Sequence, residues 1–89
     1  MALVTFTPNL QRHITCPPSE AAGRTVREVL DFVFSQNDAL RGYILDDQCV
    51  LRRHMNIFVN GEPILDRTSL SDRVSDTDEV FVLQALSGG

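Results

Sequence analysis

The chain has 89 residues, of which 43% are hydrophobic and 22% are charged. These proportions are ordinary for one small globular domain and exclude a disordered chain. Eight cationic and 12 acidic side chains give a net charge of −4, which is the wrong sign for a nucleic-acid-binding protein. No apolar run approaches the ~20 residues that cross a bilayer, and the first residues lack the features of a signal peptide. We therefore expect a cytoplasmic protein whose partners include no nucleic acid and no membrane.

The reactive side chains are few. All eight cations are arginine and the chain contains no lysine, which excludes Schiff-base chemistry on a side-chain amine. Two cysteines, Cys16 and Cys49, form no C-x-x-C pair and are too few for a four-cysteine iron–sulfur cluster. A zinc site that combines them with His13 and His54 is conceivable, but the spacing fits no finger or ribbon. We interpret both cysteines as small core side chains and expect no metal site.

The first quarter of the chain predicts extended structure. Residues 3–7 alternate as a half-buried strand does, and a second extended stretch is expected at about 12–16, after Pro8-Asn9 interrupts the first. The paired prolines of residues 17–23 predict a loop.

A helix is predicted to begin at Thr25. Thr25 can accept from the backbone N–H three residues later while Glu28 reaches back, the pattern of a capping box. The helix has one apolar stripe, formed by Val26, Val29, Leu30 and Val33. Asn37 is expected to end it in a left-handed conformation, and a further short helix over residues 38–43 is expected to break near Gly42.

The second half predicts a hairpin and a long final strand. Residues 55–59 read as a strand, Asn60-Gly61 as a two-residue turn with positive φ at both positions, and residues 62–64 as a short edge strand. Leu70 and Val74 suggest a helical turn that plugs the core, and residues 79–86 a last strand. This order predicts an α+β fold in which one main helix covers a mixed sheet of four to five strands, with the first and last strands paired at its centre.

Alternation also predicts the two faces of the sheet. In the last strand Val80 and Val82 should point to the helix, which leaves Phe81 and Leu83 on the open face. The same parity in the strand at 55–59 buries Ile57 and Val59 and turns Phe58 outward. An open face that carries Phe58, Phe81 and Leu83 is a candidate partner-binding patch.

The sequence ends in Ser87-Gly88-Gly89. Glycine lacks a Cβ, so a Gly-Gly segment can enter a channel too narrow for other residues. Residues 86–89 would span roughly 13 Å when extended. The α-carboxylate is a poor electrophile, and adenylation by ATP is the plausible route to its activation.

Four stretches carry a resemblance to a known family: residues 23–30, 56–62 and 76–80, and the terminal Gly88-Gly89. Together they resemble the ThiS/MoaD family of sulfur carriers, which are ubiquitin-like β-grasp proteins that end in Gly-Gly. Residues 54–62 are most similar to the carriers of cysteine biosynthesis and next to the small subunit of molybdopterin synthase. Thr77 replaces the glycine of the family's Asp-Gly-Asp turn, so this turn must avoid a positive φ.

The resemblance implies a function. Residues 1–86 would form the β-grasp domain and residues 87–89 a flexible tail. A ubiquitin-activating-like adenylating enzyme would use ATP and magnesium to adenylate Gly89, and a sulfur donor would convert it to a thiocarboxylate. A biosynthetic enzyme of a cysteine, molybdopterin or thiamine-type pathway would accept the sulfur. The protein would then be a co-substrate and not an enzyme, with no bound cofactor, and a monomer when free.

The resemblance also bears on partner binding, since the position that matches Leu83 lies at the partner interface of the molybdopterin carrier. Leu86 and Ser87 would join Phe58, Phe81 and Leu83 as partner-binding residues.

Three alternatives remain open. The chain would be a ubiquitin-like modifier if the activated Gly89 were joined to lysines of other proteins. It would be an enzyme if His13 or His54 acted with a cysteine, although lone histidines beside arginines are more often surface residues. It would be a plain interaction domain if the Gly-Gly end were incidental.

Overall fold

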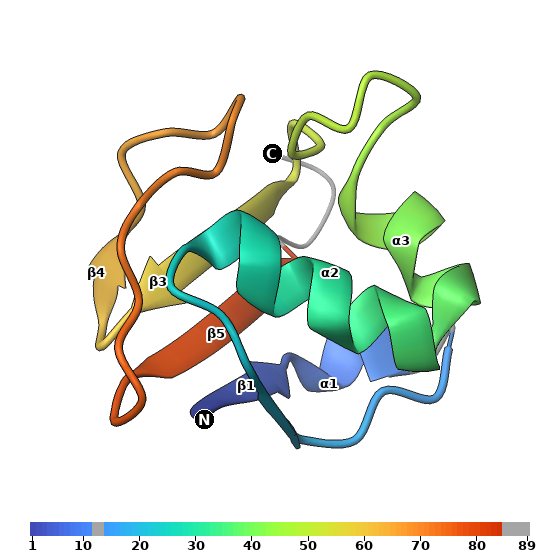
Figure 1. Ribbon diagram of the computed structural model, residues 1–89. Helices are drawn as coiled ribbons and strands as arrows, with labels where there is room; N and C mark the ends of the chain where they lie inside the picture. The colour runs from blue at the N-terminus through green and yellow to red at the C-terminus, as the bar shows by residue number, and fades with distance from the viewer. Residues whose placement is uncertain (12–13, 85–89) are drawn as a thin grey trace.

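The computed structural model describes residues 1–11 and 14–84. Within these residues one sheet of five strands packs against helices (Figure 1). The elements in chain order are β1 (Ala2–Phe6), α1 (Pro8–Gln11), β2 (Ser19–Ala21), α2 (Val26–Gln36), α3 (Asp38–Ile44), β3 (Met55–Val59), β4 (Glu62–Pro63) and β5 (Glu79–Gln84).

The strand order in the sheet is β2-β1-β5-β3-β4. The central strand β5 is parallel to β1 and antiparallel to β3. Helix α2 crosses one face of this sheet, and the other face carries no helix in Figure 1. The predicted α+β fold, a mixed sheet covered by one main helix with the first and last strands paired at its centre, is confirmed.

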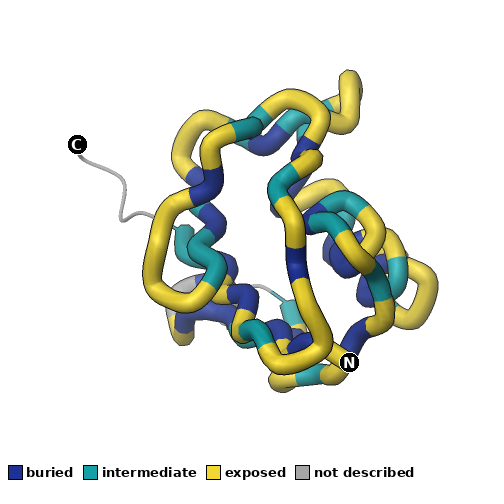
Figure 2. Tube along the Cα trace, turned by 60° about the vertical axis from the view of Figure 1, so that its left-hand side comes forward, coloured by how far each residue is buried: buried dark blue, intermediate teal, exposed yellow. Residues whose placement is uncertain are grey.

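The core lies between α2 and the sheet. Apolar side chains at helical spacing on α2 meet the inward side chains of β1, β3 and β5, and all of them are almost completely removed from water (Figure 2). The side chains with no exposed area include Val4, Val26, Val29, Leu30, Met55, Val80 and Val82. Alternation along the strands therefore selects one sheet face for burial, as the sequence predicts.

The start of α2 confirms the predicted N-cap. The Thr25 hydroxyl accepts from the Glu28 N–H at 3.2 Å, while the Glu28 carboxylate accepts from the N–H of Arg24 at 3.0 Å and not from that of Thr25. Gly23 has a φ of +151°, and a Cβ there would lie 2.7 Å from the backbone nitrogen of Val29. Glycine is required at Gly23 because the incoming chain lies directly against the first turn of the helix.

The region between β1 and α2 differs from its prediction. Pro8 begins the short helix α1, because proline at a first helical position needs no N–H donor. The second strand, β2, is Ser19–Ala21, inside the stretch predicted as a loop, and it pairs with β1. In the predicted stretch at 12–16, residues 14–16 are in no strand, and residues 12–13 lie outside the described residues.

The end of α2 also corrects the sequence analysis. Asn37 has a φ of −147°, so it is not left-handed. Its side-chain amide instead donates to the carbonyl of Thr15 at 2.8 Å. Helix α3 follows at once and continues through Gly42 to Ile44, because Leu40 and Ile44 bury completely on one side of it. Burial of these two side chains outweighs the ~1 kcal/mol cost of an interior glycine.

The hairpin and the final strand largely match expectation. Asn60 and Gly61 have φ values of 51° and 85°, which confirms the predicted turn, and β4 is the edge strand. Leu70 and Val74 plug the core as predicted, but from an irregular loop in which Leu70 has a φ of 56°. The described part of β5 ends at Gln84, and the predicted boundary between residues 86 and 87 lies outside the described residues. No described helix is long and apolar enough to span a bilayer.

Candidate functional site

The sheet face opposite α2 is the candidate functional site. The antiparallel register of β3 and β5 places Phe58 directly opposite Phe81 and Asn56 opposite Leu83. Thr5 of β1 lies beside Phe81 in the parallel pair. The three side chains that alternation assigned to the open face, Phe58, Phe81 and Leu83, therefore do share it.

This face keeps apolar surface in contact with water. Phe81 and Leu3 are each 37% exposed, Phe58 and Leu83 are half-buried, and Pro63 of β4 is exposed opposite Phe58. These five residues, Leu3, Phe58, Pro63, Phe81 and Leu83, are called the open-face patch below. Contiguous apolar side chains on two or more strands are typical of a surface that binds another protein.

Val59 departs from its predicted burial. It packs against the core but stays half-buried, because the neighbouring strand β4 has only two residues and gives little cover at this edge.

The end of β5 is held firmly on its β1 side. The backbone N–H of Gln84 donates to the Thr7 hydroxyl at 3.3 Å, and the N–H of Thr7 donates to the carbonyl of Val82 at 3.1 Å. Gln84 also stands opposite the fully buried Met55 in the register with β3. The four remaining predicted site residues, Leu86, Ser87, Gly88 and Gly89, lie outside the described residues.

Arg67, which the sequence analysis did not single out, stabilises the start of β3, the strand beside the end of β5. The guanidinium of Arg67 donates to the carbonyls of Met55 at 2.7 Å and Arg52 at 2.9 Å, and more weakly to that of Arg53 at 3.4 Å. It also donates to the Asn56 side chain at 3.1 Å. Arg67 thereby fixes the start of β3 next to the last residue of β5. No local signal could have found it, because its acceptors lie 11 to 15 residues earlier in the chain.

A second feature that the sequence analysis did not predict links the turn between β3 and β4 to the start of β5. The side chain of Asn60 accepts from the Glu79 N–H at 2.9 Å and donates to the Asp78 carboxylate at 2.7 Å. That carboxylate also accepts from the Ser75 N–H, and these hydrogen bonds lower the pKa of Asp78. Two stretches that carry the family resemblance therefore meet in one network, which sets where β5 begins. Thr77 has no positive φ, as its β-branched side chain requires.

Among the residues that the structure describes, the side chains of the alternative zinc site form no metal-binding group. Cys16 is buried, and burial raises the pKa of its thiol, which keeps it protonated and unreactive at neutral pH. Cys49 is exposed in a turn with a φ of 61°, so its interpretation as a core side chain is wrong. His54 is exposed and His13 lies outside the described residues. Within residues 1–11 and 14–84 no group of three His, Cys, Asp or Glu side chains could hold a metal ion.

A central strand flanked by a parallel and an antiparallel neighbour, with one helix across one face, defines a ubiquitin-like β-grasp protein. The profile of the ThiS family matches residues 11–89. The chain therefore belongs to the ThiS family, and the resemblance seen in the sequence is confirmed.

Solved structures agree with this assignment. A chain in the crystal structure of the Amycolatopsis orientalis BexX/CysO complex is similar with a TM-score of 0.84 and 28% identity, over 100% of both chains. Small archaeal modifier protein 1 from Methanosarcina acetivorans has a TM-score of 0.82 and 27% identity, over 99% of this chain and 95% of that one. CysO of Mycobacterium tuberculosis, at 24% identity, shares the fold with a TM-score of 0.80, over 97% of this chain and 100% of that one. None of the curated proteins matches the chain.

Proposed function

We propose that this chain is a sulfur carrier whose C-terminal glycine, Gly89, is adenylated and then converted to a thiocarboxylate. Membership of the ThiS family and similarity to CysO and small archaeal modifier structures support a ubiquitin-like sulfur carrier or modifier. The observation that carries the proposal is the position of β5 in the sheet. The strand that leads in sequence to Gly88-Gly89 is the central strand of the sheet, bonded on both sides.

The proposed chemistry needs only a free α-carboxylate from this chain. A C-terminal carboxyl has a reference pKa of ~3.3–3.7, so it is ionised at neutral pH and can attack the α-phosphorus of ATP. Pyrophosphate leaves, and magnesium on the activating enzyme neutralises the phosphate charge. Sulfide then attacks the glycyl carbonyl carbon and AMP departs, which leaves a thiocarboxylate. A persulfide donor instead forms an acyl disulfide, and a thiol of the partner enzymes then attacks the donor's sulfur, so that a disulfide forms on the partner and the thiocarboxylate is released. The protein is therefore a co-substrate with no bound cofactor, and the catalytic groups belong to its partners.

We assign partner binding to the open-face patch. The adenylating enzyme covers this face while Leu86 and Ser87 lead Gly89 to its ATP site, and the sulfur-accepting biosynthetic enzyme binds afterwards. The five residues that follow Gln84 in the sequence, residues 85–89, reach at most ~18 Å. This short reach requires the body of the domain to dock close to the partner's active site. The use of ATP places the proposed cycle in the cytoplasm.

The test uses the adenylating enzyme encoded by the same organism, with ATP, magnesium and sulfide. Intact-mass spectrometry should first show Gly89 as the C-terminal residue, and then the exchange of one oxygen for sulfur. Deletion of Gly89, or Gly88→Val, should abolish the exchange and cost less than ~0.5 kcal/mol of stability, the usual effect of a surface substitution. Gly42→Ala is the matched control, since a Cβ at Gly42 meets nothing within 4 Å. An unchanged mass with an active enzyme refutes the proposal, and so does normal activation of the shortened chain.

A second candidate function is protein modification, which the similarity to small archaeal modifier protein 1 favours. The same acyl-adenylate would then be attacked by a lysine amine of a target protein, and AMP would leave as an isopeptide bond forms. Because this chain contains no lysine, conjugates could not extend through its own side chains. Mass spectrometry of proteins that co-purify with the tagged chain should then find Gly89 joined to lysine. The same preparation from the Gly89 deletion should contain none.

A further inference from the structure

Leu65 is the most exposed large apolar side chain among the described residues. It lies just after β4 and is 92% exposed. Its backbone is nevertheless fixed: the N–H groups of Leu65 and Asp66 donate to the two oxygens of the Asp72 carboxylate at 3.0 and 2.9 Å. The preceding residue, Ile64, donates to the carbonyl of Ile57 at 3.0 Å. An ordered backbone therefore holds this leucine in water.

The loop that follows Leu65 is equally well ordered. The Asp66 carboxylate accepts from the N–H groups of Thr68, Ser69 and Ser71 and from the Ser71 hydroxyl. The loop then places Leu70 in the core with no exposed area. A surface that is already rigid loses little conformational entropy when it binds.

A groove of about 500 Å³ lies beside Leu65. Val59, Pro63 and Ile64 form much of its apolar lining. Pro63 also stands opposite Phe58, so this residue belongs both to the groove and to the open-face patch. The edge strand β4 has only two residues, and Pro63 has no N–H, so an added strand would find few backbone partners. Recognition here must use side chains.

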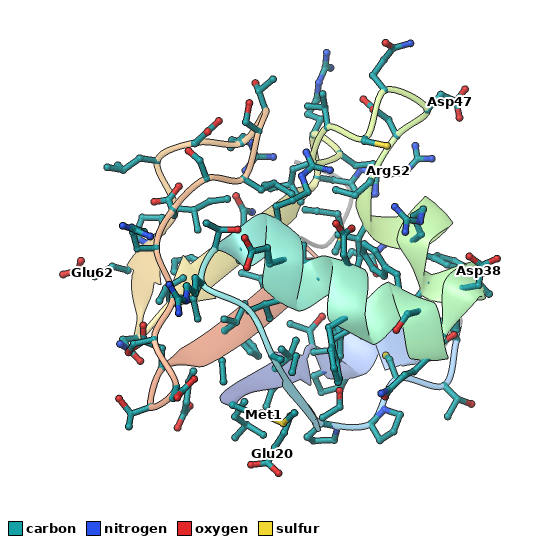
Figure 3. The ribbon with its side chains drawn as sticks, in the orientation of Figure 1. Met1, Glu20, Asp38, Asp47, Arg52 and Glu62 are labelled. Atoms are coloured by element: carbon teal, nitrogen blue, oxygen red, sulfur yellow. The ribbon has the colours of Figure 1, made fainter. Side chains whose placement is uncertain are left out.

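The segment around this groove is predominantly acidic, although Arg73 also lines the groove. Residues 60–79 contain six acidic side chains and two arginines, whereas the rest of the chain has six of each, so this segment accounts for the whole net charge of −4. Figure 3 shows Glu62 pointing away from α2 at the β4 side of the sheet, and Glu62 and Asp72 both line the groove. The acidic side chains of the segment are Glu62, Asp66, Asp72, Asp76, Asp78 and Glu79.

We propose that Leu65 and its groove are a second contact surface for the adenylating enzyme, which meets them with an apolar socket bordered by arginine or lysine side chains. The acidic surroundings of Leu65 favour a basic partner surface. Because Pro63 belongs to both surfaces, the partner that covers the open-face patch also reaches the groove. This inference rests on the proposed function and adds the chemistry of the partner's surface.

The experiment measures the KM for the carrier in ATP–pyrophosphate exchange catalysed by the adenylating enzyme of the same organism. Leu65→Ser should raise KM about tenfold, the effect of removing one buried leucine from an interface, with an unchanged melting temperature. Glu62→Arg should raise KM about fivefold at low salt and much less at high salt, because screening weakens exposed charge pairs. Asp47→Arg is the matched control. It makes the same charge change on the loop before β3, far from β4 in Figure 3, and should leave KM within about twofold.

The two proposals fail differently. No exchange with the wild-type chain refutes the proposed function, and this inference with it. Normal exchange by wild type with an unchanged KM for Leu65→Ser overturns the second contact surface alone. Equal changes in KM for Glu62→Arg and Asp47→Arg would overturn the proposal that basic side chains of the partner border the socket. A normal KM with impaired sulfur transfer to the accepting enzyme would assign Leu65 to that other partner and also overturns the inference.

Discussion

Both faces of β5 carry apolar side chains, but one face is buried and the other is partly exposed to water. Val80 and Val82 have no exposed area beneath α2, whereas Phe81 is 37% exposed and Leu83 is half-buried on the other side. A run of four apolar residues is typical of a strand covered on both faces, yet the described residues cover only one. Burial of one face stabilises the fold, and we attribute the apolar character of the other face to partner binding.

The largest effect should follow from a charge on the covered face. Val82→Asp would place an ionised carboxylate between α2 and the sheet without a partner, which should cost about 4 kcal/mol or more and unfold the domain. Urea denaturation followed by circular dichroism measures this loss. A stable Val82→Asp variant would mean that the parity of β5 is opposite to the one described here.

The neighbouring position should behave in the opposite way. Leu83→Asp on the open-face patch should cost only about 1 kcal/mol of stability, since the side chain is already half in water. It should weaken binding to the adenylating enzyme at least about tenfold. Calorimetric titration and thermal melting of the same preparation separate the two quantities. Tight binding by a folded Leu83→Asp protein would remove the open-face patch from the proposed interface.

Local chemistry explains why much of the fold was predictable. The alternation of β5, the cap at Thr25 and the Asn60-Gly61 turn each depend on residues within a few positions of one another. The same holds for the assignment of Phe58 and Phe81 to the open face, because parity along each strand decides it. These features survive in the structure with little change.

What could not be predicted depends on distant partners. Ser19–Ala21 becomes a strand because β1 offers it an edge, and no local pattern reveals that edge. Arg67 looks like a surface cation in sequence, yet it binds the carbonyls at the start of β3. Leu70 takes a positive φ in a loop that brings its side chain into the core, and its carbonyl accepts from the Arg27 N–H at the start of α2. The backbone of Leu65 is likewise held by the carboxylate of Asp72, seven residues later.

The smallest effect should come from acid, and it should act on the covered side of the molecule. Hydrogen bonds from the Ser71 hydroxyl and then from the N–H groups of Ser69, Ser71 and Thr68 lower the pKa of Asp66 from 3.8 to about 2. Because the folded pKa is depressed, the stabilisation from Asp66 is fully present above pH ~4 and is lost as the pH falls towards 2. Its loss should loosen the loop that carries Leu70 to the helix side of the sheet.

Asp66→Asn isolates this contribution, since the amide does not titrate but can still accept a hydrogen bond. Urea midpoints measured at pH 7, 4 and 2.5 should fall less steeply between pH 4 and 2.5 for the variant than for wild type. Asp78, whose pKa is also lowered, should leave part of the acid dependence in place. Phe58 and Phe81 lie on the opposite face, so their proton resonances should change little over the same range. Parallel acid profiles of the two proteins would show that the loop that carries Leu70 does not depend on the charge of Asp66.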